Sequence, residues 1–372
     1  MRGRILFNGN AGSDLIDVSA PYVLSSAHRN APKVLIVTAA WGVGEYNEGP
    51  IKRALYGIGV PADVRDGYDR NVYNLCAWHA WADFLGKRPD VAQVHADIQA
   101  AQDEIRRFYL EKTAFHADLI RRGVRAVRAR RPRFSLGRVN DRDPLRPEAV
   151  HTGSEIVEKA LGRELAASID ALVDNDERML KSFSDAEEAL LARTGLRMDP
   201  QWRAVRERLE ERILSADAVL LFGGSPQKLL APFRFFDLRP ALLETLRRGA
   251  TVVASSAGAL VLCERMIVYD ERNGDPSQRD FRLLDSGLGL VGGVQILPHC
   301  MDRIHTDDAD NLAYLARRFG SRICVGLNEG SYLLVDLGGP TATSVGREDG
   351  VYTFGVDGVK RQYHFGERIP LG

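Results

Sequence analysis

Ser256 stands in a sequence frame that could make it a nucleophile. The apolar run at residues 251–254 predicts a buried strand, and the residues after Gly258 predict a helix. A sharp strand-to-helix turn, called a nucleophile elbow, exposes its central side chain and brings the residues two positions before and after it together. Both must then be small, and here they are Ala254 and Gly258. This frame favours Ser256 over Ser255, although small residues also occur at ordinary turns.

Two other segments end in residues that could assist such a serine. The apolar run at 218–222 leads into Gly223 and Gly224, and glycines let backbone N–H groups approach a ligand closely. The apolar run at 290–297 leads into His299. Because the carboxyl ends of strands in an open α/β sheet gather at one edge, we expect these groups to meet there. Three acids lie between the serine and the histidine, an order seen in α/β serine hydrolases: Asp270, Glu271 and Asp285.

Taken together, these motifs resemble peptidase family S51, which includes dipeptidase E and cyanophycinase. The resemblance rests on Ser-Ala-Gly-Ala from Ser256, on the Pro-His pair ending at His299, and on Val-Gly-Leu-Asn-Glu-Gly-Ser at 325–331. It covers residues 206–336 well and residues 1–65 weakly. The family fold is similar to that of class I glutamine amidotransferases, with Ser in place of the Cys nucleophile.

The resemblance implies that Ser256 is the nucleophile and His299 the base. The family acid lies about fifteen residues past the serine, which matches Glu271, with Asp270 one residue short. Dipeptidase E has Asp at this place, so Glu271 departs from that pattern. The Gly-Gly-Ser-Pro-Gln segment at 223–227 also departs from the usual Gly-Gly-Asn or Gly-Gly-Asp of the family.

The mechanism expected of this site is acyl transfer. His299 would take the proton of Ser256, and the acid would hold the imidazole in place. The oxyanion would be stabilised by the N–H groups of Gly224 and Ala257. Gln227 is expected to contact the substrate. Glu329 could bind a substrate amine or support His299, and a structural role in its loop is the alternative. Because no metal-ligand spacing occurs, we expect neither a metal nor a cofactor.

The elements that must position these residues form an α/β pattern. Strand-like runs at 3–8, 33–39 and 60–64 surround a helix at 49–57, which predicts a mostly parallel sheet with helices on both faces. We assign residues 1–65 and 206–372 to this catalytic domain. Residues 66–205 lack strand patterns and predict a large helical insertion. Runs at 342–345 and 351–354 around an Asp-Gly pair predict a hairpin.

The amino-acid composition limits which kinds of partner and compartment we expect for this protein. The 50 basic and 50 acidic residues give no net charge, and no apolar run is long enough to span a membrane. The start of the chain lacks an apolar leader, and the four cysteines lack C-x-x-C spacing. We therefore expect a cytoplasmic protein with reduced thiols and no membrane partner.

The insertion carries a run of eight arginines without an acid at residues 121–138. Such a run could bind a nucleic acid, an acidic substrate or subunit, or only solvent. Neutral net charge argues against a nucleic-acid partner and favours an acidic partner within the chain or in a subunit. The periodic apolar positions of the insertion must also be covered, which predicts either a lid over Ser256 or a homo-oligomer.

The leading hypothesis is a serine peptidase or amidohydrolase acting on a peptide substrate. The resemblance implies an exopeptidase and a peptide or isopeptide bond next to an Asp-type residue. One alternative is a non-hydrolytic binding or regulatory protein on the same fold. Another is an amidotransferase-like enzyme that uses a cysteine, although Cys263 and Cys300 lie away from the centre of the elbow.

Overall fold

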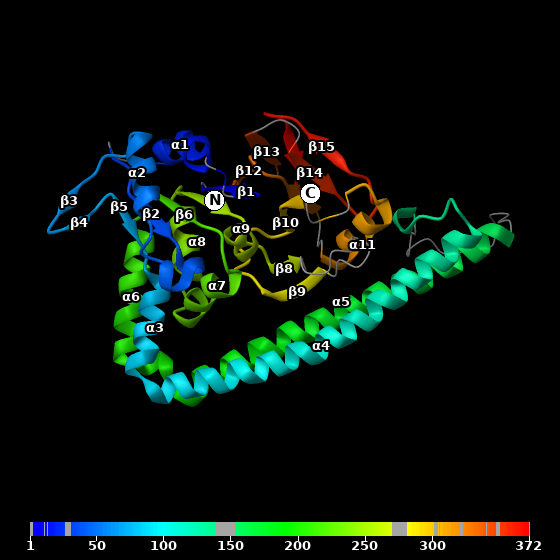
Figure 1. Cartoon of the computed structure of the whole chain (residues 1–372), viewed down its shortest axis with the longest axis horizontal. Helices are drawn as coiled ribbons and strands as arrows, with labels where there is room; N and C mark the ends of the chain where they lie inside the picture. Colours follow the sequence, from blue (N-terminus) through cyan, green and yellow to red (C-terminus); the bar gives the residue numbers. More distant parts are fainter. Residues whose placement is uncertain are drawn as a thin grey trace.

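Eight short strands form the central sheet of the computed structural model (Figure 1). The structure describes residues 3–10, 12, 14–26, 31–138, 153–269, 281–300, 304, 306–319, 323–339, 341–346 and 350–371. From edge to edge the strands are β16 (Arg368–Pro370), β13 (Thr341–Gly346), β12 (Ser331–Asp336), β1 (Arg4–Asn8), β7 (Thr251–Ser255), β6 (Ala218–Leu221), β2 (Val34–Val37) and β5 (Val72–Asn74). Five neighbouring strands run parallel: β1, β7, β6, β2 and β5. The other three, β12, β13 and β16, pair in antiparallel fashion. The predicted mostly parallel α/β fold is thus confirmed.

Both faces of the central strands are buried, which explains why β2 and β6 are continuously apolar. In β1, Ile5 and Phe7 face one core while Leu6 faces the other. The first face is covered by α3 (Ala77–Lys87), α6 (Pro200–Leu214), α7 (Pro226–Phe235), α8 (Arg239–Arg247) and α9 (Ala257–Leu262). The second face is covered by α1 (Leu15–Ser25) and α2 (Gly49–Gly57).

A second, four-stranded sheet adjoins the first. Its order is β10 (Val294–Pro298), β11 (Ile323–Leu327), β14 (Val351–Phe354) and β15 (Arg361–Tyr363), with only β10 and β11 parallel. Helix α11 (Ala309–Phe319) and a ribbon of β8 (Arg265–Tyr269) and β9 (Phe281–Ser286) pack on it. The sheets meet at Gly9, where an added methyl group would lie 2.5 Å from the Leu327 carbonyl oxygen. The carboxyl ends of β1 and β11 are therefore neighbours.

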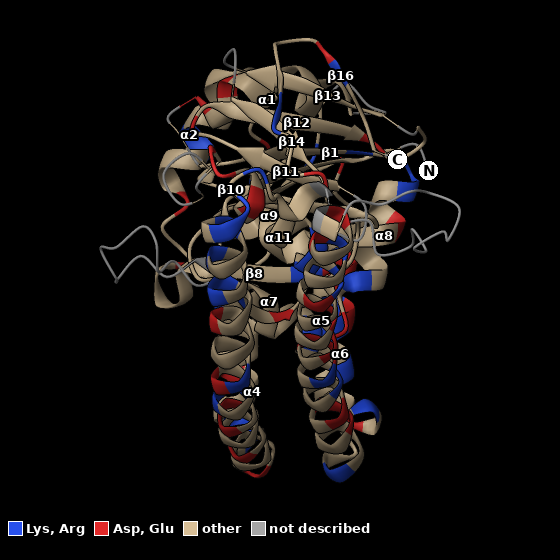
Figure 2. Cartoon of the chain, turned by 90° about the vertical axis from the view of Figure 1, so that its right-hand side faces the viewer, with Lys and Arg blue, Asp and Glu red and all other residues tan. Residues whose placement is uncertain are grey.

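The helical insertion is an antiparallel pair that extends from the body of the molecule (Figures 1 and 2). Helices α4 (Pro89–Arg130) and α5 (Gly153–Thr194) have 42 residues each. Short 3-10 turns, η2 (Leu136–Arg138) and η3 (Leu196–Met198), follow them. Along the described residues, no helix is both long and apolar enough to cross a membrane.

Two local expectations were wrong. Residues 66–205 do contain strands: β4 (Tyr68–Asp69) forms a ribbon with β3 (Val64–Arg65), which lies just before this range, and β5 joins the main sheet beside β2. A three-residue strand such as β5 is too short to show a periodic pattern. The predicted hairpin is absent, because β13 pairs with β12 and β16 whereas β14 pairs with β11 and β15. A local turn signal cannot reveal that neighbouring strands are buried in different sheets.

Candidate active site

Ser256 lies at a sharp turn between β7 and α9, in a strained backbone conformation. Its φ of 50° and ψ of −112° are rare for a residue with a side chain. The turn also requires the small residues noted in the sequence. A methyl group on Gly258 would lie 2.6 Å from the Leu221 carbonyl oxygen, and Ala254 is fully buried. These contacts hold the serine at the carboxyl end of the strand.

The structure brings the side chains of Ser256 and His299 together. The Ser256 Oγ lies 3.1 Å from the His299 Nε2, within hydrogen-bond reach. His299 directly follows β10 and also has a positive φ, of 53°. If Nε2 is the unprotonated nitrogen, the serine hydroxyl donates to it, which is the arrangement a general base needs.

These two residues do not share one sheet, contrary to the expectation of a single sheet edge. Ser256 directly follows β7 of the eight-stranded sheet, whereas His299 directly follows β10 of the second sheet. The sequence shows strand ends but not strand partners, so this difference was not predictable. The contact of Gly9 with Leu327 joins the carboxyl edges of the two sheets, and the pair forms across that junction.

Asn8, at the end of β1, distinguishes the two adjacent serines. Its side-chain oxygen accepts a hydrogen bond from Ser255 Oγ at 3.0 Å, and Ser255 is fully buried. Its backbone carbonyl accepts from the Ser256 N–H at 3.0 Å, and its amide donates to the Ser331 carbonyl at 3.3 Å. Asn8 thus holds Ser255 inward. The sequence reasoning missed Asn8, although its position at a strand end could have indicated it.

The glycine pair lies directly beside Ser256. A methyl group on Gly223 would lie 2.9 Å from the Ser256 Cβ, so a larger residue would collide with the serine. Trp41 donates from Nε1 to the Gly223 carbonyl at 2.9 Å. Because a trans peptide directs its N–H opposite to its C=O, the Gly224 N–H points away from Trp41. Gly224 itself has a φ of 138°, a conformation that favours glycine.

Of the remaining predicted site residues, the structure describes Ala257, Gln227 and Glu329. Ala257 is the buried first residue of α9, next to Ser256. Gln227, in the first turn of α7, and Glu329, just after β11, are both exposed. The third acid between serine and histidine, Asp285, forms a 3.0 Å ion pair with Arg234. The two candidate acids lie outside the described residues: Asp270 and Glu271.

Three cysteines lie near these strands but are unsuited to act as nucleophiles. Burial raises the pKa of Cys263, Cys300 and Cys324 to about 12. The nucleophilic form of cysteine is the thiolate, which is negligible at neutral pH for such groups. Across the described residues, no three His, Cys, Asp or Glu side chains are grouped to hold a metal ion.

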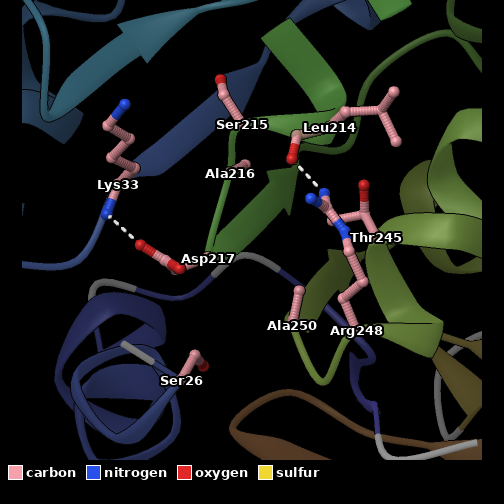
Figure 3. Close-up of a pocket in the computed structure, with 9 residues that line it drawn as sticks. All are labelled: Ser26, Lys33, Leu214, Ser215, Ala216, Asp217, Thr245, Arg248 and Ala250. Atoms are coloured by element: carbon pink, nitrogen blue, oxygen red, sulfur yellow. Dashed lines mark hydrogen bonds between the residues drawn. The ribbon is translucent and has the colours of Figure 1, made fainter. Parts of the chain in front are cut away.

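A pocket among the described residues lies away from this site. It has a volume of about 300 Å³ and is lined among others by Lys33, Asp217 and Arg248 (Figure 3). Asp217 and Ala250 directly precede β6 and β7, so the pocket lies at the amino ends of these strands. Ser256 lies at the opposite, carboxyl edge, where ligands of open α/β sheets bind.

Comparison with known proteins provides an independent finding. The model of Peptidase family S51 matches residues 174–341, a segment that contains Ser256 and His299. The crystal structure of a peptidase from an acI-B1 Actinobacterium is similar with a TM-score of 0.47 and 14% sequence identity, covering 100% of this chain and 97% of that one. The search of curated proteins found no match. The similarity to peptidase family S51 over residues 174–341 thus includes the strand-to-helix turn and both members of the serine–histidine pair.

Proposed function

We propose that this peptidase is a serine enzyme, with Ser256 as nucleophile and His299 as general base. The observation that carries the proposal is the 3.1 Å approach of Ser256 Oγ to His299 Nε2 at a strained strand-to-helix turn. Strain of this kind persists where the surrounding structure holds it, and it concentrates at functional sites. The buried, protonated cysteines favour the serine over a thiol mechanism.

The reaction follows from this geometry. His299 accepts the Ser256 proton as the oxygen attacks the substrate carbonyl, and it then protonates the leaving amine. The N–H groups of Gly224 and Ala257 stabilise the oxyanion, since one adjoins the serine in sequence and the other in space. Water attacks the resulting ester, with His299 as base again, and releases the acid product. Glu271 or Asp270 orients the imidazole in this proposal.

The substrate is a peptide or isopeptide with an Asp-type residue beside the scissile bond. Lys228, on the first turn of α7, is suited to contact such a carboxylate. Its side chain lies beside Gly42, where an added methyl group would be 3.1 Å from the Lys228 Nζ. Trp41, next to Gly42, binds the Gly223 carbonyl, which places this cation on the same loop cluster as Ser256. Gln227 and Glu329 are the further proposed substrate contacts.

Labelling with a fluorophosphonate probe tests the nucleophile. The probe should modify Ser256 alone, and Ser256→Ala should lose both labelling and peptide hydrolysis, by about 10³–10⁶ in kcat. Ser255→Ala is the matched control, because that serine is buried against Asn8 and should leave labelling intact. Labelling at Ser255 would overturn the assignment. A protein that hydrolyses no acidic dipeptide or isopeptide and takes up no probe would instead be a binding protein.

Substitution of Lys228 tests the substrate class. Lys228→Met should lower kcat/KM about tenfold for Asp-containing peptides, the loss of one charge-assisted hydrogen bond. The matched Asn-containing peptides should be much less affected, because they offer no carboxylate. Lys228→Arg, which keeps the charge, is the control variant. Equal losses for Asp and Asn peptides would remove Lys228 from substrate recognition.

A further inference from the structure

The outer face of α4 carries an exposed apolar stripe. Phe108, Phe115 and Leu119 are 62%, 68% and 49% exposed. Their spacing of seven and four residues places them on one side of a helix. The buried residues of α4, such as Thr113 and Ile120, lie on the other side and pack toward α5. The stripe therefore does not serve the contact between the two helices of the insertion.

Charged residues continue this stripe in both directions, with opposite sign. Toward the start of α4 the exposed residues of the stripe are Asp97 and Glu104, and toward its end they are Arg122 and Arg130. In Figure 2 basic residues colour the upper end of α4. Arg122 also pairs with Asp118 of its own helix at 2.7 Å, but its side chain remains 74% exposed. The stripe thus runs from acidic to apolar to basic along the helix, with the exposed Glu111 and Lys112 between Phe108 and Phe115.

If two copies of α4 lie antiparallel, the acidic end of each stripe faces the basic end of the other. Glu104 lies as far before Thr113 as Arg122 lies after it, and Asp97 and Arg130 are disposed in nearly the same way. Phe108 and Leu119 also lie at nearly equal distances from that centre. A parallel partner would instead place acid against acid and arginine against arginine, which is unfavourable.

We propose that two copies of this chain dimerise through the outer faces of their α4 helices, antiparallel about a two-fold axis near Thr113. In this arrangement Phe108 packs against Leu119 of the second copy, and Glu104 faces Arg122 of the second copy. An isologous contact of this kind uses each pair twice. At 1.5 Å per residue, the segment from Asp97 to Arg130 forms a contact about 50 Å long.

The main competing contact for the basic end of α4 is within the chain. Arg128 lies 2.7 Å from Asp310 and 3.7 Å from Asp308, both at the start of α11. Arg128 lies on a different side of the helix from Arg122 and Arg130, because it is not in their register. The intrachain pair therefore accounts for one arginine of the basic run and leaves the arginines of the stripe available to a second copy.

Sedimentation velocity over a range of concentrations tests the apolar part of the contact. The natural chain should reach twice the mass of one chain. Phe108→Gln combined with Phe115→Gln should raise the dimer dissociation constant more than about a hundredfold, since each substitution acts twice across the axis. Phe365→Gln is the control, because Phe365 has the same 62% exposure outside the stripe. A monomer at every concentration overturns the proposal, as does a dimer that tolerates the double substitution.

Charge exchange tests the register. Glu104→Arg and Arg122→Glu should each raise the dissociation constant at least about tenfold, because like charges then face each other twice. An equal mixture of the two single variants should recover the dimer, since both pairs are attractive in the mixed species. Lys181→Glu, which disrupts an exposed i,i+4 pair on α5, is the control. If mixing fails to restore the dimer while both variants keep the natural unfolding temperature, the antiparallel register is wrong.

Discussion

At the scale of single residues, the site is a pair of strained positions held by their neighbours. Ser256 and His299 both have φ near 50°, which costs of the order of 1–3 kcal/mol each. Asn8 binds the Ser256 N–H, and Gly223 and Gly258 leave room for the turn. Each of these neighbours is small or bears an amide, and none of them supplies the chemistry. Their contribution is to keep the hydroxyl 3.1 Å from the His299 Nε2, as the proposed proton transfer requires.

The proposed pair should behave as one unit in a double-mutant cycle. His299→Ala should reduce kcat about as severely as Ser256→Ala, and the double variant should be little worse than either. The reason is that the serine hydroxyl is a poor nucleophile without its base. Steady-state kinetics with an Asp-containing peptide measures the three variants. Additive losses, or near-normal turnover by His299→Ala, would exclude His299 from the mechanism.

At the scale of elements, helix α5 is attached to the body by a buried ion pair. Arg318 of α11 donates to both carboxylate oxygens of Asp176 at 2.8 and 3.1 Å, and also to the Phe281 carbonyl at 2.9 Å. Both members of the pair are nearly inaccessible to solvent. The pair thus links the insertion to α11 and to the β8–β9 ribbon, which pack on the second sheet.

Removing one member of this pair should be strongly destabilising. Asp176→Ala leaves the Arg318 charge buried without its carboxylate, which costs about 3–5 kcal/mol in the free energy of unfolding. Denaturant unfolding followed by circular dichroism measures the loss. Asp174→Ala on the same helix is the matched control and should change stability by less than about 0.5 kcal/mol, because Asp174 is exposed. Similar losses for both variants would mean that the ion pair does not anchor α5.

At the scale of the whole molecule, the position of one sheet relative to the other sets the distance between Ser256 and His299. Ser256 follows a strand of the larger sheet and His299 follows a strand of the smaller one. The close approach of Gly9 to Leu327 and Asn328 joins the two edges. A small shift of one sheet against the other would lengthen the distance from Ser256 Oγ to His299 Nε2.

Gly9→Ala should therefore impair catalysis more than it impairs folding. The added methyl group would collide with two backbone carbonyl oxygens at 2.5 and 2.6 Å, so the sheets must separate. A displacement of about 1 Å can cost about 10²-fold in rate, and we expect a loss of that order in kcat. Gly86→Ala, where nothing lies within 4 Å of the added group, is the control and should retain normal turnover. Normal turnover by Gly9→Ala would show that the junction tolerates movement.

The local parts of this protein could be predicted from its amino-acid sequence. Apolar runs followed by helical patterns predicted the mostly parallel α/β sheet, and the small residues around Ser256 predicted the sharp turn after β7. The motifs around Ser256 and His299 were sufficient to indicate a resemblance to the S51 family. Each motif consists of residues adjacent in the chain, so it can be recognised without knowledge of the fold. Periodicity over long segments also indicated α4 and α5.

Which strands are neighbours could not be predicted and became clear from the folded chain. The tertiary structure placed β5 beside β2, separated β13 from β14, and set His299 in a different sheet from Ser256. It also identified Asn8 and Trp41, which hold the serine turn and the glycine pair from distant parts of the chain. Such contacts depend on burial and on pairing between segments far apart, and no local pattern of residue types encodes them.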